Sequence, residues 1–124
     1  MGFSLGSFLS LSIGALNPGQ IAAIVEYYGG LPPRLRDGAK AMPPTLILHG
    51  DKDVLVPVAD AHELDDLLTK ANRPHEMKIY AGANHAFNFP ELAIWYNADD
   101  AQDAWARSVK FLAVNLNNPA TPTK

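Results

Sequence analysis

The sequence predicts an α/β fold, in which a mostly parallel sheet of about three strands is flanked by helices. Helix-like and strand-like segments alternate along the 124 residues, as they do where helices cover a parallel sheet. The first two strand-like segments are apolar at nearly every position, which is typical of strands buried on both faces. Hydrophobic residues make up 48% of the chain and charged residues 19%, which is the balance of a globular domain.

The first helix and the first strand are expected before residue 31. Residues 5–16, "LGSFLSLSIGAL", are apolar on nearly every side, and the following "NPG" ends a helix because proline cannot continue it. A helix of this kind belongs in the interior of a protein. Residues 21–28, "IAAIVEYY", are rich in strand-forming residues and are closed by two glycines. The proline-rich residues 31–44 are expected to form a surface loop.

The second half of the chain is expected to contribute two more strands. These are residues 45–48, "TLIL", and residues 76–82, "EMKIYAG". Between them, apolar residues recur every three or four positions over residues 58–70, which predicts an amphipathic helix with its acidic side chains in water. The strand, helix, strand order favours a parallel pairing of the two strands.

A long final helix is predicted over residues 98–116. Asn97, with Asp100 three residues later, is typical of a helix start, because an acidic group stabilises the positive end of the helix dipole. Its inner face is expected to carry four apolar residues, namely Ala101, Trp105, Leu112 and Leu116. The folded domain is therefore placed at residues 1–118, and residues 119–124 are expected to form a flexible tail.

Composition and charge exclude several classes of function. The net charge is −3 and the ten Lys and Arg residues are spread thinly, which leaves no basic surface for nucleic acid or for a membrane. There is no cysteine, hence no disulfide framework and no thiolate nucleophile. The apolar residues 3–16 are shorter than the ~20 needed to span a bilayer, and the first basic residue is Arg34, so no signal-peptide leader is evident. We expect a cytoplasmic protein.

Three residues point to nucleophilic catalysis. Residues 2–6, "GFSLG", spell G-x-S-x-G, which marks Ser4 as a nucleophile where a strand enters a sharp turn and a helix leaves it. Asp53 follows the "TLIL" strand and His85 follows the "EMKIY" strand. Reactive groups of open α/β sheets gather outside the carboxyl ends of the strands. The three side chains should therefore meet, and their order Ser, Asp, His is that of α/β-hydrolase triads.

Each residue type has a role in that chemistry. A serine hydroxyl is a poor nucleophile at neutral pH, so the imidazole of His85 must take its proton during attack. The carboxylate of Asp53 would fix the tautomer of that imidazole and stabilise the cation that forms. The backbone N–H of Leu5, at the start of the helix, would be one donor of the oxyanion hole. The mechanism requires neither a metal nor an organic cofactor, and no cluster of ligands suggests one.

Other polar and aromatic residues near these positions are alternatives. Asp51 could be the acid, but it lies within the turn itself, so Asp53 is preferred. His49 is expected to be a packed structural imidazole, whereas His62 and His75 are expected to be solvated. Three aromatic residues could line the pocket for a small ester substrate, although those in the loop could simply plug it against the core: Phe3, Trp95 and Tyr96.

At this point the residues resemble the dienelactone hydrolase family of α/β-hydrolases. The resemblance rests on "GFSLGS", "VEYYGG", "PTLILHGDKDVLVP", "YAGANHAFNF" and "DAWARSVKFL", and it runs from Gly2 to about Asn115. The resemblance implies the carboxyl-terminal half of such a domain, with Ser4 as nucleophile, Asp53 as acid, His85 as base and Leu5 as an oxyanion donor.

Two departures from the family pattern alter the expected substrate. Dienelactone hydrolases proper use a cysteine nucleophile, whereas this chain has Ser4 and looks more like the general esterases of the family. They also place an arginine shortly after the histidine to hold the substrate carboxylate. Here residues 87–89, "FNF", follow His85. The resemblance therefore implies hydrolysis of a neutral ester.

A third departure concerns the strands that complete members place ahead of the nucleophile. Met1 stands where such a strand would run into the motif, so we expect an internal start within a longer hydrolase gene, or a truncation. A three-strand sheet beside an all-apolar helix would expose an apolar patch, which soluble monomers rarely do. We expect a homo-oligomer or a complementing chain to cover it. The alternative to an esterase is a half-domain with little or no activity that acts as an assembly unit.

Overall fold

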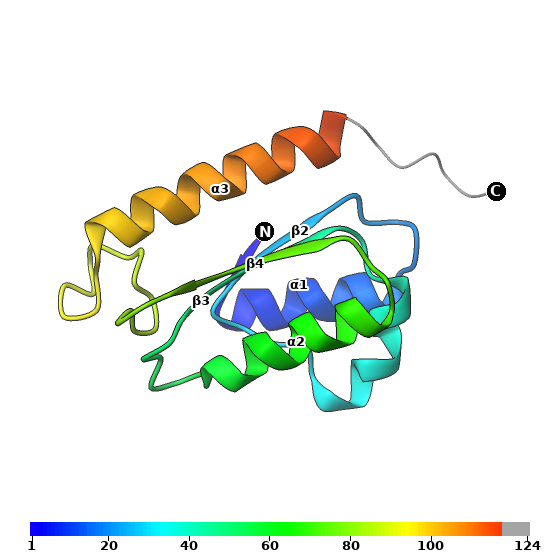
Figure 1. The fold of residues 1–124 in the computed structure, drawn as a ribbon, viewed down its shortest axis with the longest axis horizontal. Coiled ribbons are helices and arrows are strands. Elements are labelled where there is room, and N and C mark those ends of the chain that lie inside the picture. The colour runs from blue at the N-terminus through cyan, green and yellow to red at the C-terminus, as the bar shows by residue number, and fades with distance from the viewer. Residues whose placement is uncertain (118–124) are drawn as a thin grey trace.

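The computed structural model describes residues 1–117 and shows a four-stranded parallel sheet with helices on both faces (Figure 1). The elements follow in the order β1 (Gly2–Phe3), α1 (Leu5–Leu16), β2 (Ile24–Tyr27), a 3₁₀ helix (Pro33–Ala41), β3 (Thr45–Gly50), α2 (Val58–Lys70), β4 (His75–Tyr80) and α3 (Ala98–Asn117). The strands lie side by side in the order β1-β2-β3-β4, and each neighbouring pair is parallel. The predicted tail, residues 119–124, lies outside the described residues.

The core is divided into two layers by the sheet. Helix α3 covers one face, and α1 and α2 cover the other (Figure 1). On the α3 side, Tyr27, Leu48 and Phe87 belong to one buried cluster. On the other side, Leu11 and Leu64 belong to a second cluster. Both faces of the central strands are therefore dry, which explains why β2 and β3 are buried at every position.

The sheet has one more strand than the sequence predicts. Gly2 and Phe3 form a two-residue strand, β1, paired with Glu26 and Tyr27 of β2. The strand that leads into Ser4 is therefore formed by the first two residues of the motif itself, which suffice to add to the parallel ladder. Glycine is required at the first position, since a Cβ on Gly2 would collide with the carbonyl of Gly6.

Two further expectations are corrected. Residues 31–44 are not simply a loop, because they contain the 3₁₀ helix. The inner face of α3 is formed by Ala104, Ser108 and Phe111, whereas Trp105 and Leu116 are 56% and 54% exposed. Ala101 and Leu112 lie at the border and are partly buried. The hydroxyl of Ser108 bonds to the Tyr27 hydroxyl at 2.8 Å and to the Ala104 carbonyl at 2.7 Å, so a polar residue occupies a position that an apolar pattern does not reveal.

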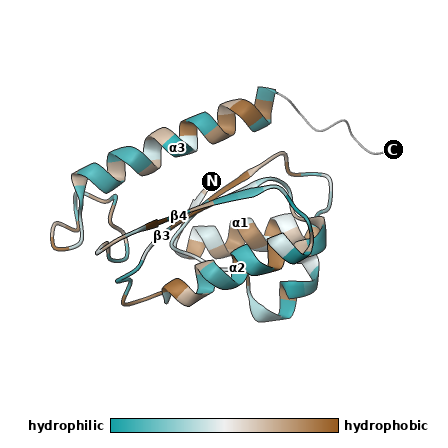
Figure 2. Ribbon diagram, viewed as in Figure 1, coloured by the Kyte–Doolittle hydropathy of each residue, from teal (hydrophilic) through white to brown (hydrophobic). Residues whose placement is uncertain are grey.

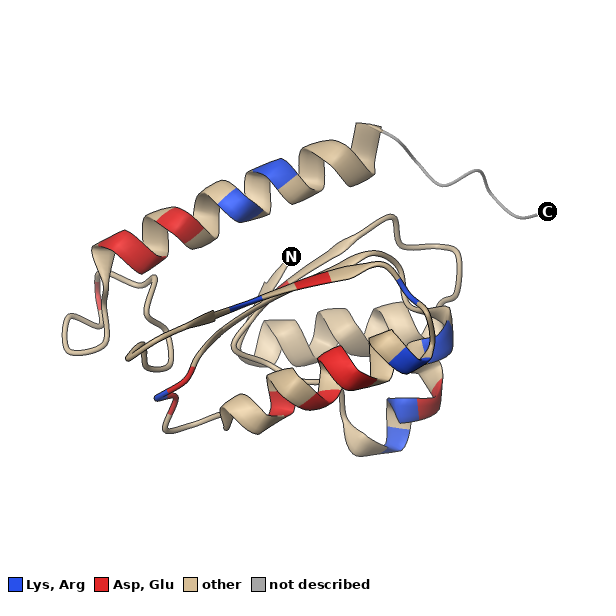
Figure 3. Cartoon of the chain, viewed as in Figure 1, with Lys and Arg blue, Asp and Glu red and all other residues tan. Residues whose placement is uncertain are grey.

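Helix α1 is only half covered. Its bounds are those the sequence predicts, and Ser7, Leu11, Gly14 and Ala15 are buried. Four large side chains one turn apart are 49–70% exposed and form what we call the apolar α1 face: Leu5, Leu9, Ile13 and Leu16. Figure 2 shows how apolar this helix is, and Figure 3 shows that it lacks the charges that α2 and α3 carry. Within residues 1–117, no helix has the length and apolar character needed to cross a membrane.

Candidate active site

Ser4 occupies a sharp turn between β1 and α1. Its backbone lies at φ 53° and ψ −117°, a strained region for a residue with a side chain. Hydrogen bonds on both sides of Ser4 fix this conformation. The Ser4 N–H donates to the Tyr27 carbonyl at 3.0 Å, and the Ser7 N–H donates to the Ser4 carbonyl at 2.9 Å. A strained serine between a strand and a helix is the geometry of a nucleophile elbow.

The structure brings Ser4, His85 and Asp53 together. The Oγ atom of Ser4 lies 3.0 Å from Nε2 of His85, and Nδ1 of the same imidazole lies 2.8 Å from Oδ2 of Asp53. A carboxylate oxygen accepts hydrogen bonds, so this contact favours the tautomer of His85 whose proton lies on Nδ1. Nε2 is then free to accept the proton of the serine hydroxyl. The Asp53 side chain is 0% exposed and that of His85 is 7% exposed.

Hydrogen bonds join the loop that carries Asp53 to the loop that carries His85. Oδ1 of Asp53 accepts the N–H groups of Leu55 at 2.8 Å and Val56 at 2.7 Å, which fixes the carboxylate. Asp51 accepts the Gly82 N–H at 2.7 Å. It therefore shapes the turn, as the sequence predicts, and it does not contact His85. Asn84, which sequence reasoning missed, accepts the N–H groups of His85 at 2.7 Å and Val54 at 3.1 Å.

The remaining histidines differ in their relation to these three residues. Nε2 of His49 lies 3.5 Å from Oδ2 of Asp53, the carboxylate oxygen that also contacts His85. His49 is fully buried, and its Nε2 donates to the Val56 carbonyl at 2.8 Å, so it is a packed structural imidazole as predicted. Burial lowers the pKa of His49, which keeps the ring neutral. His62 is exposed. His75 is not simply solvated: it begins β4, and its Nε2 lies 3.0 Å from Asp65 of α2, because the strand brings it alongside that helix.

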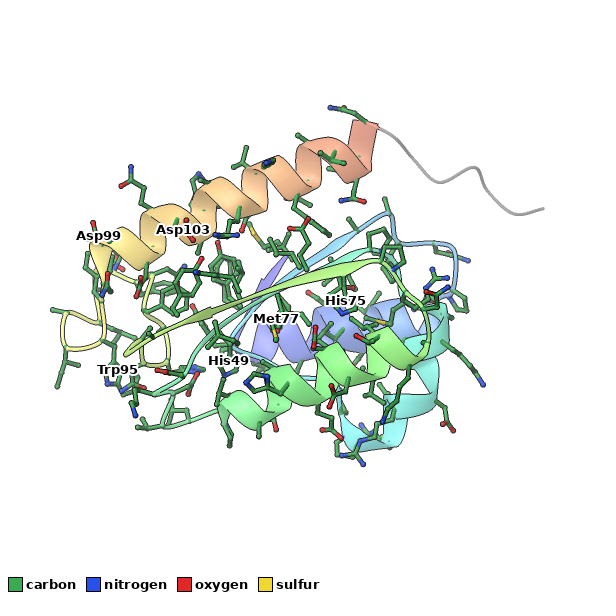
Figure 4. The ribbon with its side chains drawn as sticks, in the orientation of Figure 1. His49, His75, Met77, Trp95, Asp99 and Asp103 are labelled. Atoms are coloured by element: carbon green, nitrogen blue, oxygen red, sulfur yellow. The ribbon has the colours of Figure 1, made fainter. Side chains whose placement is uncertain are left out.

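Aromatic residues surround the relay unevenly. The Trp95 ring is half-buried and lies edge-on to the His85 ring, with centroids 6.3 Å apart. Figure 4 shows Trp95 and His75 at opposite ends of the sheet. Phe3 packs on Tyr27 at a centroid distance of 4.6 Å. Tyr96 is 39% exposed, and no ring contact joins it to His85 within the described residues. Of the three aromatic residues that the sequence offers for a substrate pocket, only Trp95 has a ring contact with His85 among the described residues.

Tyr28 is a neighbour of His85, and the sequence analysis did not single it out. Its ring lies 4.6 Å from the His85 ring, and its hydroxyl donates to Oδ1 of Asn88 at 2.7 Å. The backbone of Tyr28 has φ 41°, a left-handed conformation that turns the chain at the end of β2. The only local signal of this turn is the pair of glycines that follows it.

The backbone N–H of Leu5, which the sequence offers as an oxyanion donor, stands at the start of α1 beside Ser4. Leu5 is the first residue of α1, and the first N–H groups of a helix have no acceptor within it. The positive end of the helix dipole adds to the attraction for a negative charge at this point.

A separate cleft of about 360 Å³ lies between β4 and α3, where Glu76, Arg107 and Lys110 are among its lining residues. Ser4, Asp53 and His85 are not among its lining residues.

A parallel sheet between helices, with a strained serine after a strand, is the architecture of the α/β-hydrolases. An α/β hydrolase from a deep-sea metagenome library of the Medee basin, MGS-M1, shares this fold: the TM-score is 0.74 at 20% identity, over 94% of this chain and 53% of that one. The profile of the dienelactone hydrolase family matches residues 1–116. The chain belongs to the dienelactone hydrolase family.

Two further similarities agree with this assignment. A candidate dienelactone hydrolase from Klebsiella pneumoniae superposes with a TM-score of 0.79 at 30% identity, over 90% of this chain and 50% of that one. A candidate carboxymethylenebutenolidase from Saccharolobus solfataricus is 36% identical over 115 residues, which are 90% of this chain and 42% of that protein. The chain thus spans about half the length of the curated relatives it matches.

Proposed function

We propose that this chain carries the Ser-His-Asp triad of a serine hydrolase that cleaves small carboxylic esters. The observation that carries the proposal is the unbroken relay from Ser4 Oγ through His85 to Asp53, with contacts of 3.0 and 2.8 Å. These are hydrogen-bond distances suited to a nucleophile, a base and a group that orients the base. The resting geometry needs no rearrangement before proton transfer.

The first half of the reaction forms an acyl-enzyme. Ser4 Oγ attacks the ester carbonyl carbon while its proton passes to Nε2 of His85, and the carbonyl electron pair moves onto oxygen. Asp53 stabilises the imidazolium that results. The oxyanion then collapses, the carbon–alkoxide bond breaks, and the alcohol leaves with the proton from His85. The Leu5 N–H supports the oxyanion in this step.

The second half releases the acid and restores the enzyme. A water molecule attacks the acyl carbon of Ser4 while His85 takes one of its protons. The bond between the acyl carbon and Ser4 Oγ then breaks, and the serine recovers its proton from the imidazolium. The products are one carboxylic acid and one alcohol for each ester and water consumed.

The surroundings of His85 favour a neutral acyl group. Phe87 is buried, Asn88 is engaged by the Tyr28 hydroxyl, and Phe89 is 42% exposed. None of the three supplies a cation for a substrate carboxylate. Trp95 lies edge-on to His85 and Phe3 lies edge-on to Phe89, so both add apolar surface. A small uncharged ester therefore suits this site better than an anionic lactone.

The test is the hydrolysis of p-nitrophenyl acetate by the purified chain. We expect turnover that Ser4→Ala abolishes and that Ser12→Ala preserves, since Ser12 bonds only to the Phe8 carbonyl within its own helix. An ester that bears a free carboxylate should be cleaved more slowly than its methyl-capped analogue. Turnover that is equal in the wild type and in Ser4→Ala would refute the proposal.

A second candidate role is favoured by the apolar α1 face. Four large side chains on this face are 49–70% exposed, and β1 pairs with β2 on one side alone among the described strands. We propose that the chain associates with a second copy through this face, as an assembly unit that works with or without catalysis. Light scattering should show a dimer or larger oligomer that Leu9→Glu dissociates. A monomer at micromolar concentration would contradict self-association and leave the face to a complementing chain.

A further inference from the structure

Glu26 is a buried carboxyl that the proposed mechanism does not use. It lies in β2, opposite Gly2 of β1, and is 0% exposed. Its Oε2 accepts two hydrogen bonds, from the Ser7 hydroxyl at 2.6 Å and from the Gly29 N–H at 3.0 Å. Its Oε1 has no hydrogen-bond partner within residues 1–117. A fully buried acid is costly, so its presence calls for a reason.

The two groups that Glu26 binds support the two reacting residues. Ser7 stands in the first turn of α1, where its N–H bonds to the Ser4 carbonyl at 2.9 Å. Gly29 follows Tyr28, whose ring lies 4.6 Å from the ring of His85. Oε2 of Glu26 therefore links the turn that holds Ser4 to the turn whose Tyr28 packs against His85.

The turn at Gly29 is packed tightly against the first turn of α1. A Cβ on Gly29 would lie 2.5 Å from the Ser7 Cβ and 3.1 Å from the Ser4 carbonyl oxygen. The turn that carries Tyr28 is thus pressed directly against the elbow. A shift of either segment would change the 3.0 Å distance between Ser4 Oγ and His85 Nε2, and misplacing reacting groups by about 1 Å costs on the order of 100-fold in rate.

We propose that Glu26 is a positioning residue that clamps the first turn of α1 to the turn after β2 and so keeps Ser4 within hydrogen-bond reach of His85. The inference rests on the proposed function for its catalytic consequence and on the Glu26 contacts for its geometry. An uncharged acceptor with the same shape can make both bonds, whereas an apolar side chain of similar volume can make neither.

The electrostatic surroundings agree with a clamp that works in the neutral form. Burial raises the pKa of Glu26 to about 7, and the nearby Asp60 of α2 adds to the increase, while the bonds from Ser7 and Gly29 act against it. Asp60 is the charged group that faces Glu26 from α2, and α1 contributes the uncharged Ser7. The side chain at this position therefore need not be ionised to hold the two turns.

The experiment compares four variants with the wild type. Glu26→Gln keeps the acceptor, Glu26→Leu removes it, Ser7→Ala removes one of the two bonds, and Ser12→Ala is the control on the same helix. The first measurement is the reaction of each chain with a fluorophosphonate, resolved into probe affinity and maximal rate of inactivation. The second is the ¹⁵N NMR spectrum of the His85 imidazole, which reports the Ser4–His85 hydrogen bond without any reaction.

The proposal predicts a specific pattern. Glu26→Leu should lower the maximal inactivation rate by roughly 10- to 100-fold at unchanged probe affinity, Ser7→Ala should lower it by several-fold, and Glu26→Gln and Ser12→Ala should stay within about threefold of the wild type. The His85 Nε2 resonance should move in Glu26→Leu and Ser7→Ala alone. If Glu26→Leu does not fold, Ser7→Ala provides the same test.

The outcomes separate this proposal from the proposed function. A wild type that does not react with the fluorophosphonate refutes the hydrolase activity, and the His85 resonance then decides on Glu26: movement in Glu26→Leu and Ser7→Ala supports the clamp. Unchanged His85 resonances and an unchanged inactivation rate in both variants would overturn it. A loss of rate in Glu26→Gln equal to that in Glu26→Leu would overturn it too, because charge and not hydrogen bonding would then matter.

Discussion

Glu26 makes the pH dependence of stability predictable. Burial raises its pKa from 4.5 to about 7, so the folded chain holds this proton more tightly than the unfolded chain does. As the pH rises from about 4.5 to about 7, the unfolded state releases the proton first, and the folded state loses stability relative to it. The loss is complete above about pH 7. Replacement by glutamine removes the ionisation and keeps the acceptor for Ser7 and Gly29.

The size of the effect follows from the shift. One pKa unit corresponds to about 1.4 kcal/mol, so a rise from 4.5 to about 7 amounts to about 3 kcal/mol across the window. This is a large share of the ~5–15 kcal/mol by which domains are stable. Other groups titrate in the same range. Burial lowers the pKa of His49, so the contribution of this residue to folding stability rises with pH. Such terms are common to both chains and cancel in the difference between wild type and Glu26→Gln.

The assay is urea unfolding of both chains at about pH 5 and about pH 8. We expect Glu26→Gln to gain on the wild type by about 2 to 3 kcal/mol between the two pH values, most of the full window. A difference that is independent of pH within experimental error would refute the reasoning, since it would mean that Glu26 ionises normally in the folded state. A difference of the opposite sign would mean that the folded protein stabilises the carboxylate.

Three further outcomes are expected. Asp53→Asn should lower p-nitrophenyl acetate turnover by about 10⁴-fold, because the imidazole loses the partner that fixes its tautomer; turnover within tenfold of the wild type would assign the acid elsewhere. Gly29→Ala should destabilise the chain by at least about 1–3 kcal/mol in urea unfolding, since its Cβ would lie 2.5 Å from the Ser7 Cβ, and a neutral effect would show that the turn can move. Phe87→Ala should cost about 3–5 kcal/mol, because the ring is 0% exposed, and a loss below about 1 kcal/mol would contradict its place in the core.

The sequence predicts best those helices whose bounds depend on neighbouring residues. Helices α1 and α2 begin and end where the sequence predicts, because apolar spacing and proline or glycine boundaries are written in consecutive residues. Ser4 was predicted from the G-x-S-x-G motif, and Asp53 and His85 were predicted because each follows a strand and parallel strands bring their carboxyl ends together. Their meeting in space is confirmed by the structure, while their catalytic role stays a prediction.

The features that the sequence did not reveal depend on distant partners. β1 exists only because Gly2 and Phe3 pair with β2, and two residues carry no pattern of their own. The inner face of α3 was misjudged because Ser108 is buried by a bond to the Tyr27 hydroxyl. Glu26 carries no local signal of the role proposed for it, since its hydrogen-bond partner Ser7 is 19 residues away along the chain.

The measurement that most directly tests the account is fluorophosphonate labelling read by intact mass. The relay of 3.0 and 2.8 Å contacts predicts a single adduct, located on Ser4, that forms in the wild type and disappears in His85→Ala. Absence of any adduct on the wild type, or an adduct that persists at the wild-type rate in His85→Ala, would contradict the claim that this chain holds a working serine hydrolase triad.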